Sequence, residues 1–158
     1  TALGKAVFSH PGKMRWEYLE PEKQEIITNG KFLWIYRPGQ NQVLVGEAEE
    51  FFKTGAGGAF LSDIALIRQN YIITVQENTD DYTDLKLMPQ TQDPNISKII
   101  IRVSKNSNDI SRVIIHNTQG DSNLFEFTAI RFKDIDNSLF EFEIPDGVNI
   151  VELNKRKI

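Results

Sequence analysis

The segment from Lys13 to Tyr18 alternates strictly between apolar and charged side chains. Met14, Trp16 and Tyr18 fall on one face of an extended chain, and the charged residues between them fall on the other. A helix would mix the two sets, because its side chains repeat every 3.6 residues or so. The alternation therefore predicts a β-strand with one buried face.

Short apolar runs of this kind recur along most of the chain and are separated by residues typical of turns. The Asn29-Gly30 pair lies between two of these runs, and such a pair is the strongest short-range hairpin signal in a sequence. We therefore predict a mainly β fold of about eleven short strands. The predicted strands span residues 3–8, 13–18, 24–28, 31–37, 43–45, 71–75, 85–88, 96–103, 110–116, 123–132 and 139–144.

The segment 59–69 departs from the strand pattern. Phe60, Ile64 and Ile67 recur there at helical spacing, with Leu61 beside them. We predict a short amphipathic helix at this point, and it interrupts an otherwise all-β chain.

A glycine-rich stretch precedes the predicted helix and contains Gly55, Gly57 and Gly58. Such a stretch can cradle a phosphate, but this one lacks the Lys-Ser/Thr ending of a P-loop. Because glycine is conformationally permissive, we interpret the stretch as a flexible hinge.

Composition excludes several classes of protein. The chain has 158 residues, and we expect a single domain over residues 1–158. It contains no cysteine, which excludes disulfides, thiolate catalysis and cysteine-ligated zinc. With 22 acidic against 18 basic residues, it lacks the broad positive charge that nucleic-acid binding requires. No apolar stretch approaches the roughly 20 residues of a membrane-spanning helix.

Catalytic and metal-binding signals are sparse. The two histidines, His10 and His116, are far apart, and neither lies in a motif such as HExxH. Aspartates at positions 80, 81, 84, 134 and 136 lie between predicted strands and match no calcium loop, so we interpret them as turn residues. We expect no enzymatic activity, no metal and no other cofactor.

Aromatic residues are abundant, with ten Phe, four Tyr and two Trp spread over the predicted strands and helix. Core packing accounts for most of them. Several of the later predicted strands are apolar on both faces, so their sheet must be covered twice or must face a cavity. A sheet curved around the predicted helix would enclose an apolar pocket, and such a pocket suits acyl chains.

Two separated motifs resemble one known family. The first begins at His10 as HPGKMRWEY and continues into a hairpin with NGK at 29–31 and LWIY at 33–36. The second is the closing segment FEFEIPDGVNI at 140–150. These motifs resemble the outer-membrane lipoprotein carrier family LolA, whose patterns are Arg-Pro-Gly-x-x-x-Trp, Gly-Lys-x-Leu-Trp-x-Tyr and Phe-x-Phe-x-x-Pro-x-Gly-Val. The resemblance covers nearly the whole chain.

The resemblance implies a curved, antiparallel, incomplete β-barrel with a short helical lid over an apolar cavity. It also implies a periplasmic carrier that binds the acyl chains of lipoproteins and shuttles them from the inner to the outer membrane. The implied partners are acylated lipoproteins, an inner-membrane ABC transporter as donor and an outer-membrane receptor as acceptor. Contact with membranes would be transient, nucleic acid would not be bound, and the protein would be a monomer.

The resemblance also suggests where the site lies. Trp16 matches the family's cavity-side tryptophan, and the predicted helix falls in the family's lid segment. The expected cavity lining consists of Met14, Trp16, Tyr18, Trp34, Phe60, Leu61, Ile64 and Ile67. The residues expected to control the lid are His10, Gly55, Gly57 and Gly58.

Two departures from the family pattern affect the lid and the start of the chain. His10 replaces the arginine that holds the lid closed in the family, and an imidazole is a weaker and pH-dependent donor. The family's N-terminal helix has no counterpart here, which indicates either a divergent member or a chain that begins after that helix.

Three other roles remain open at this stage. A lipid-sensing regulatory domain of the same fold would bind acyl groups in order to switch a partner. A membrane-anchored outer-membrane receptor would accept the cargo instead of carrying it. An enzyme on the same scaffold is disfavoured because the sequence offers no nucleophile with a base and an orienting group.

Overall fold

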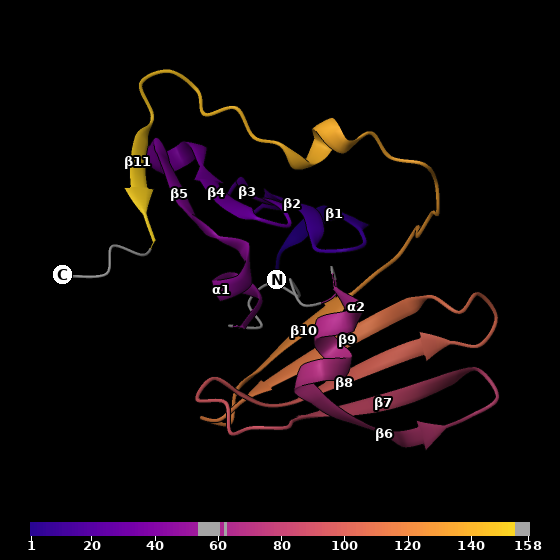
Figure 1. Cartoon of the computed structure of the whole chain (residues 1–158). Helices are drawn as coiled ribbons and strands as arrows, with labels where there is room; N and C mark the ends of the chain where they lie inside the picture. Colours follow the sequence, from indigo (N-terminus) through magenta and orange to yellow (C-terminus); the bar gives the residue numbers. More distant parts are fainter. Residues whose placement is uncertain (54–60, 62, 154–158) are drawn as a thin grey trace. The chain divides into compact units, whose positions relative to one another are not determined.

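Figure 1 shows the computed structural model of the protein, which describes residues 1–53, 61 and 63–153. The chain forms two compact units, one made of residues 1–64 and 134–158 and the other of residues 65–133. Each unit is built on one open β-sheet. A single domain over the whole chain stays a prediction.

The described residues contain eleven strands in two sheets, together with short helices. The mainly β prediction, with an open arrangement of strands and a short helix, is therefore confirmed. The strands are β1 (Leu3–Ser9), β2 (Lys13–Glu20), β3 (Gln24–Asn29), β4 (Phe32–Arg37), β5 (Gln42–Glu47), β6 (Tyr71–Asn78), β7 (Tyr82–Pro89), β8 (Ile96–Ser104), β9 (Ile110–Asn117), β10 (Ser122–Glu126) and β11 (Asn149–Glu152). The helical elements are α1 (Ala48–Lys53), α2 (Ile64–Asn70), η1 (Pro38–Gln40) and η3 (Asn137–Phe140).

The sheet of the first unit has the strand order β1-β2-β3-β4-β5-β11. Its first five strands form an antiparallel meander, and β11 adds to β5 in parallel. At the β3–β4 turn, Asn29 Oδ1 accepts hydrogen bonds from the backbone N–H groups of Lys31 and Phe32 at 3.0 and 2.8 Å. Gly30 has a φ of 93°, a positive value that glycine adopts readily and other residues adopt rarely. The predicted Asn29-Gly30 hairpin is therefore confirmed.

Residues 134–148, here named the return segment, run back across one face of this sheet (Figure 1). Within the segment, η3 contacts β2 and β3, and its Phe140 is only 1% exposed. The ring of Phe142 lies 5.3 Å from the ring of Tyr36 on β4. One face of the first sheet is thus covered by a segment of the same unit.

The predicted strand at 139–144 is wrong. Asp136 accepts a hydrogen bond from the backbone N–H of Ser138 at 2.9 Å and begins the η3 turn there. Phe140 and Phe142 alternate like strand residues, but they place their rings on a sheet face instead of joining a backbone ladder. The last strand is β11, and its parallel pairing with β5 also departs from the expected antiparallel arrangement.

The predicted strand at 123–132 ends early, at Glu126 of β10. The backbone N–H of Phe127 still donates to the carbonyl of Ser111 at 3.0 Å. Ala129 then adopts a φ of 54°, which no strand residue can hold. The strand pattern continues in the sequence beyond the point where the backbone leaves the ladder.

The helical prediction at 59–69 is met in part by α2, which begins at Ile64 and ends at Asn70. Residues 59, 60 and 62 lie outside the described residues. Helix α1, whose first turn contains Glu49 and Glu50, was not predicted. Acidic residues stabilise the start of a helix, but six residues are too few for a helical period to show in the sequence.

The sheet of the second unit has the order β10-β9-β8-β7-β6 and is antiparallel throughout. One of its faces is almost entirely apolar, and on that face Ile99 and Val113 are 0% exposed. The residues of this face pair across the strands in two rows, Ile73-Leu87-Ile99-Ile115 and Val75-Leu85-Ile101-Val113-Phe125.

An ion pair organises the other face of the second sheet, and its carboxylate is Asp84, which lies within β7, so its interpretation as a turn residue was wrong. Arg102 donates from Nε and Nη2 to the two carboxylate oxygens of Asp84, both at 2.7 Å. The guanidinium lies 3.5 Å from the centre of the Tyr82 ring, and the Tyr82 hydroxyl donates to Glu77 at 3.0 Å. The hydrogen bond to Asp84 raises the pKa of Arg102 further, so this cation is permanent.

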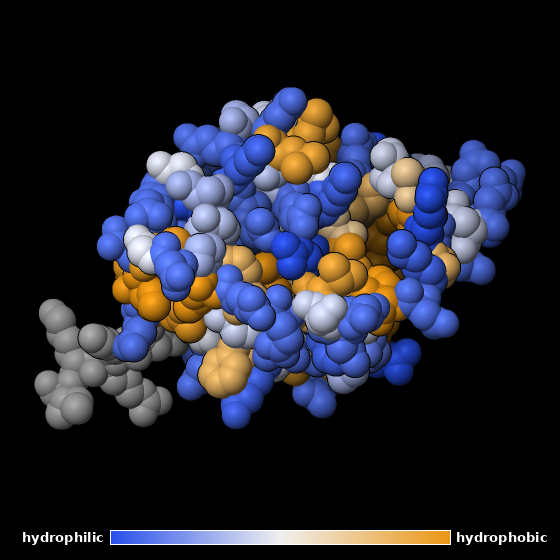
Figure 2. All heavy atoms as spheres, turned by 90° about the horizontal axis from the view of Figure 1, so that it is seen from above, coloured by the Kyte–Doolittle hydropathy of each residue, from blue (hydrophilic) through white to orange (hydrophobic). Residues whose placement is uncertain are grey.

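Exposed apolar side chains remain in both units, such as Phe132 at 85% and Ile150 at 58%. In the view of Figure 2, apolar surface is divided into separate patches by hydrophilic side chains. Within the described residues, neither helix has the length and apolarity needed to span a bilayer.

Packing of the return segment predicts a large effect of Phe140→Ala. This change removes a buried ring and should lower the free energy of unfolding by about 3–5 kcal/mol. Leu139→Ala is the matched control, because Leu139 is 40% exposed and contacts Arg15 through its backbone carbonyl, 3.3 Å from Nη1. Urea unfolding measures both changes, and equal losses in the two variants would contradict the packing described.

The Asp84–Arg102 pair predicts strong coupling in a double-mutant cycle. Asp84→Ala and Arg102→Ala should show a coupling energy of about 2 kcal/mol, because the bidentate pair is largely shielded from water. The pair between Arg112 and Glu126 is the control, since its side chains are 37% and 59% exposed and its coupling should stay below about 1 kcal/mol. Chemical unfolding of the six variants measures both energies, and equal coupling would refute the difference.

Candidate functional site

Three cross-strand rows of side chains cover the face of the first sheet that carries Met14, Trp16 and Tyr18, here named the pocket face. Strand register and alternation assign each residue to its row. The inner row is Phe8, Met14, Thr28, Leu33 and Gly46; the middle row is Ala6, Trp16, Ile26, Ile35 and Leu44; the outer row is Gly4, Tyr18, Gln24, Arg37 and Gln42.

From the inner to the outer row, the side chains become less buried and more polar. Met14 in the inner row is 0% exposed, and Trp16 and Ile26 in the middle row are each 6% exposed. The outer row is half-buried or exposed and carries hydroxyl, amide and guanidinium groups, among them those of Tyr18 and Arg37. The pocket face is therefore graded from an apolar interior to a polar rim.

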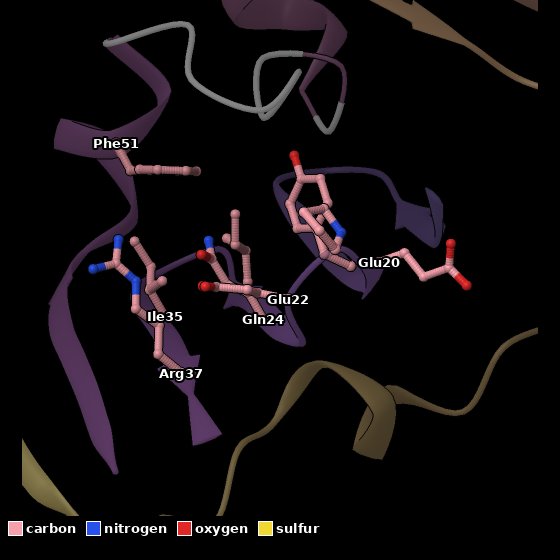
Figure 3. A pocket seen from close by; sticks show the side chains of 9 residues that line it. Glu20, Glu22, Gln24, Ile35, Arg37 and Phe51 are labelled. Carbon is pink, nitrogen blue, oxygen red and sulfur yellow. The ribbon is translucent and has the colours of Figure 1, made fainter. Parts of the chain in front are cut away.

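A pocket of about 470 Å³ lies on this face at the boundary between the middle and outer rows. Its floor includes Ile26 and Ile35, and Figure 3 shows Phe51 of α1 projecting over the strand that carries Ile35 and Arg37. The full lining is Tyr18, Glu20, Pro21, Glu22, Gln24, Ile26, Ile35, Arg37 and Phe51. All of these residues belong to the first unit.

Helix α1 is held in place by contacts at the turn ends of the sheet. The backbone N–H of Ala48 donates to the carbonyl of Lys31 at 3.0 Å, and Phe52 is only 8% exposed. Gly12 has a φ of +72°, and a Cβ there would lie 3.4 Å from the Gly30 Cα and 3.9 Å from the Phe52 ring. The β1–β2 turn, the β3–β4 turn and the Phe52 ring therefore lie close together. This packing holds α1 in place, and α1 in turn positions Phe51, which lines the pocket.

A polar groove of about 640 Å³ adjoins the pocket. Glu22, Gln24 and Arg37 line both, so the groove begins where the polar rim of the pocket ends. The remaining lining of the groove is Lys23, Pro38, Gly39 and Gln40. An elongated ligand with one apolar end and one polar end would fit a pocket with an apolar floor that continues into a polar groove.

Tyr18 combines an apolar ring with a polar tip at the rim. Its ring stacks on Trp16 with 5.9 Å between centroids. Burial raises the pKa of the Tyr18 hydroxyl above its usual value of 10.0. The hydroxyl therefore stays protonated at neutral pH and can donate a hydrogen bond to a ligand.

The structure brings together three of the predicted cavity residues and separates a fourth from them. Met14, Trp16 and Tyr18 share the pocket face, and Tyr18 lines the pocket itself. Trp34 lies on the opposite face, because it pairs with Ile27 and its neighbours in β4 point to the pocket face. It therefore does not line the pocket described here.

The residues expected in the lid are distributed differently. Leu61 is half-buried, Ile64 is 53% exposed and Ile67 is 8% exposed, and none of the three lines the pocket or the groove. His10 is exposed at the β1–β2 turn. Phe60, Gly55, Gly57 and Gly58 lie outside the described residues, so the lid and its hinge stay predictions.

Several residues that line the pocket were not predicted from the sequence. Ile26 could have been found, because it pairs with Trp16 once the Asn29-Gly30 hairpin and the turn before it set the strand register. Phe51 gave no signal, since it lies in α1, whose six residues are too few for a helical period to show in the sequence. Arg37 stood in a predicted strand without a stated role.

The described ranges, residues 1–53, 61 and 63–153, contain no group of three or more His, Asp or Glu side chains that could hold a metal ion.

Comparison with known proteins yields one consistent family. The sequence model described as "Outer membrane lipoprotein carrier protein LolA" matches residues 1–143. The chain is similar to the outer-membrane lipoprotein carrier protein of Coxiella burnetii, with 26% identity over 151 residues, covering 94% of this chain and 70% of that protein. The protein of the same description from Methylobacillus flagellatus is 24% identical over 149 residues, covering 94% and 71%.

A solved structure shares the fold at low sequence identity. It is the crystal structure of an uncharacterized conserved protein from Thermus thermophilus, with a TM-score of 0.63 and 12% identity. The likeness covers 96% of this chain and 82% of that one. It supports the architecture described above.

The opposite placement of the two tryptophans predicts a difference in quenching by a brominated alkyl-chain probe. In Trp34→Phe, the remaining Trp16 should be quenched, because it stacks on Tyr18 of the pocket lining. In Trp16→Phe, the remaining Trp34 should keep its emission. Fluorescence titration of the two variants measures this, and quenching of Trp34 alone would contradict the placement of the site.

Proposed function

Because the chain belongs to the LolA family, we propose that it is a periplasmic carrier that binds the acyl chains of lipoproteins and shuttles them from the inner to the outer membrane. The observation that carries the proposal is the pocket beneath Phe51, with Ile26 and Ile35 in its floor. Its volume of about 470 Å³ falls in the ordinary range of small-molecule sites.

Burial of the acyl chain supplies the affinity in this proposal. Each methylene group contributes about 0.8 kcal/mol, so a sixteen-carbon chain contributes on the order of 10 kcal/mol before costs. The free energy that the acyl chain loses on leaving one apolar environment is regained when it enters another of similar apolarity. A carrier can therefore exchange its cargo when donor, carrier and acceptor offer similar burial, and a pocket that opens to solvent at its rim leaves a route for exit.

The proposal includes the partners that such a route requires. An inner-membrane ABC transporter would load the pocket, and an outer-membrane receptor would accept the acyl chains from it. The cargo would be acylated lipoproteins, contact with either membrane would be transient, and the carrier would act as a monomer.

Acyl-dependent binding tests the proposal directly. A synthetic palmitoylated peptide should displace a hydrophobic fluorophore from the protein, whereas the same peptide without the acyl chain should not. Phe51→Asp should weaken binding of the palmitoylated peptide at least about tenfold, because the charge would lie over the apolar floor. Phe32→Asp is the matched control, since Phe32 is 43% exposed and lies on the opposite face.

Equal displacement by both peptides, or equal weakening by both substitutions in folded protein, would contradict the proposal. Transfer separates a carrier from a lipid-sensing domain of the same fold. Loaded protein should pass the palmitoylated peptide to a second apolar acceptor, such as lipid vesicles, and retention of the peptide would favour a sensor.

A further inference from the structure

We propose that Tyr18, Gln24 and Arg37 form a subsite for the carbonyl groups at the root of the acyl chain, where an ester or amide joins the chain to the rest of the ligand. This inference rests on the proposed function and assigns the polar end of the same site. Arg37 is its main residue.

The three side chains occupy the outer row, one step from the apolar middle row. Tyr18 adjoins Trp16 along β2, Gln24 adjoins Ile26 along β3, and so each donor stands next to the apolar floor. A chain that lies across Ile26 with its methylene groups therefore brings its terminal carbonyl to this row. Carbonyl oxygens accept hydrogen bonds, and hydroxyl, amide and guanidinium groups donate them.

Arg37 differs from the other arginines on the strands. Arg15 bonds Glu25 at 2.6 Å, Arg102 bonds Asp84 at 2.7 Å, and Arg112 bonds a glutamate on β10 at 3.1 Å. Arg37 is half-buried in the pocket lining, and its side chain makes no hydrogen bond or ion pair with any other described residue. Its guanidinium has five donors and a fixed planar geometry available for a ligand.

The charge around Arg37 favours a neutral acceptor over an anion. Glu20 and Glu22 line the same pocket, and Lys23 joins Arg37 in the adjoining groove. Two carboxylates thus balance two cations across the polar rim. A free fatty acid or a phosphate would meet these carboxylates as like charges, whereas the carbonyl of an ester or amide would not.

The groove gives the rest of the ligand a direction. It continues from Glu22, Gln24 and Arg37 along η1 and is lined there by Pro38, Gly39 and Gln40. A peptide that follows the acylated residue would leave the carbonyl subsite into this polar groove.

Ligands with and without the carbonyl group test the inference. The probes are a palmitoylated peptide, the same peptide carrying a hexadecyl chain through an amine with no carbonyl, and free palmitate. Arg37→Met keeps the bulk of the side chain and removes its donors. It should therefore weaken binding of the palmitoylated peptide about tenfold and leave binding of the carbonyl-free peptide unchanged. Lys5→Met is the matched control, because Lys5 is an exposed cation on the opposite face of the same sheet.

Tyr18→Phe supplies a second variant that removes a single hydroxyl. It should weaken binding of the palmitoylated peptide about threefold and again leave binding of the carbonyl-free peptide unchanged. Equal losses for both peptides, or none, would overturn the subsite while leaving acyl binding intact. A larger loss for palmitate than for the palmitoylated peptide in Arg37→Met would overturn the neutral carbonyl assignment. Absence of acyl-dependent binding in the unsubstituted protein would overturn the proposed function itself.

Discussion

The register of β2, β3 and β4 decides which side chains reach the pocket, because side chains in a strand alternate between two faces. A slip of one residue in β2 would place Arg15 instead of Trp16 beside Ile26 and move every side chain of β2 to the opposite face of the sheet. Hydrogen bonds from Lys31 and Phe32 to Asn29 fix one turn of this meander. The ion pair between Arg15 and Glu25, at 2.6 Å, adds a cross-strand restraint on the opposite face. The pocket therefore depends on contacts that do not line it.

The two faces of this sheet are covered in different ways, and the difference leaves room for a ligand. On one face, Phe140 and Phe142 of the return segment lie over β2, β3 and β4. On the other side, the buried Phe52 lies against the β1–β2 turn at Gly12, while the outer row of the pocket face is open at the rim. Because the sheet already has a buried side that contributes to stability, the pocket face can remain partly unfilled.

Much of the strand content could be predicted from the sequence, since alternation and turn residues act locally. The face of Trp16 followed from alternation in the same way. The face of Trp34 relative to Trp16 did not, because it depends on the register across two turns. Phe140 and Phe142 show why the last predicted strand was wrong. Alternation indicates only that two side chains point the same way, and a segment that lies across a sheet face places its side chains in this way just as a strand does. Residues such as Arg37 give no signal in the sequence, because an arginine without a partner is visible only when its neighbours are placed.

A carrier must hold an acyl chain firmly enough to keep it from water and loosely enough to release it. Apolar burial alone does not choose between chains, since it scales with the number of methylene groups and has no direction. A hydrogen-bonding row at one end of an apolar floor supplies direction, because a ligand inserted the wrong way would leave its carbonyl groups buried without donors. In the proposed function, the graded pocket face, from Met14 through Ile26 to Arg37, would separate affinity from orientation. Affinity could then be tuned by the length of buried chain while the orientation of the cargo stayed fixed.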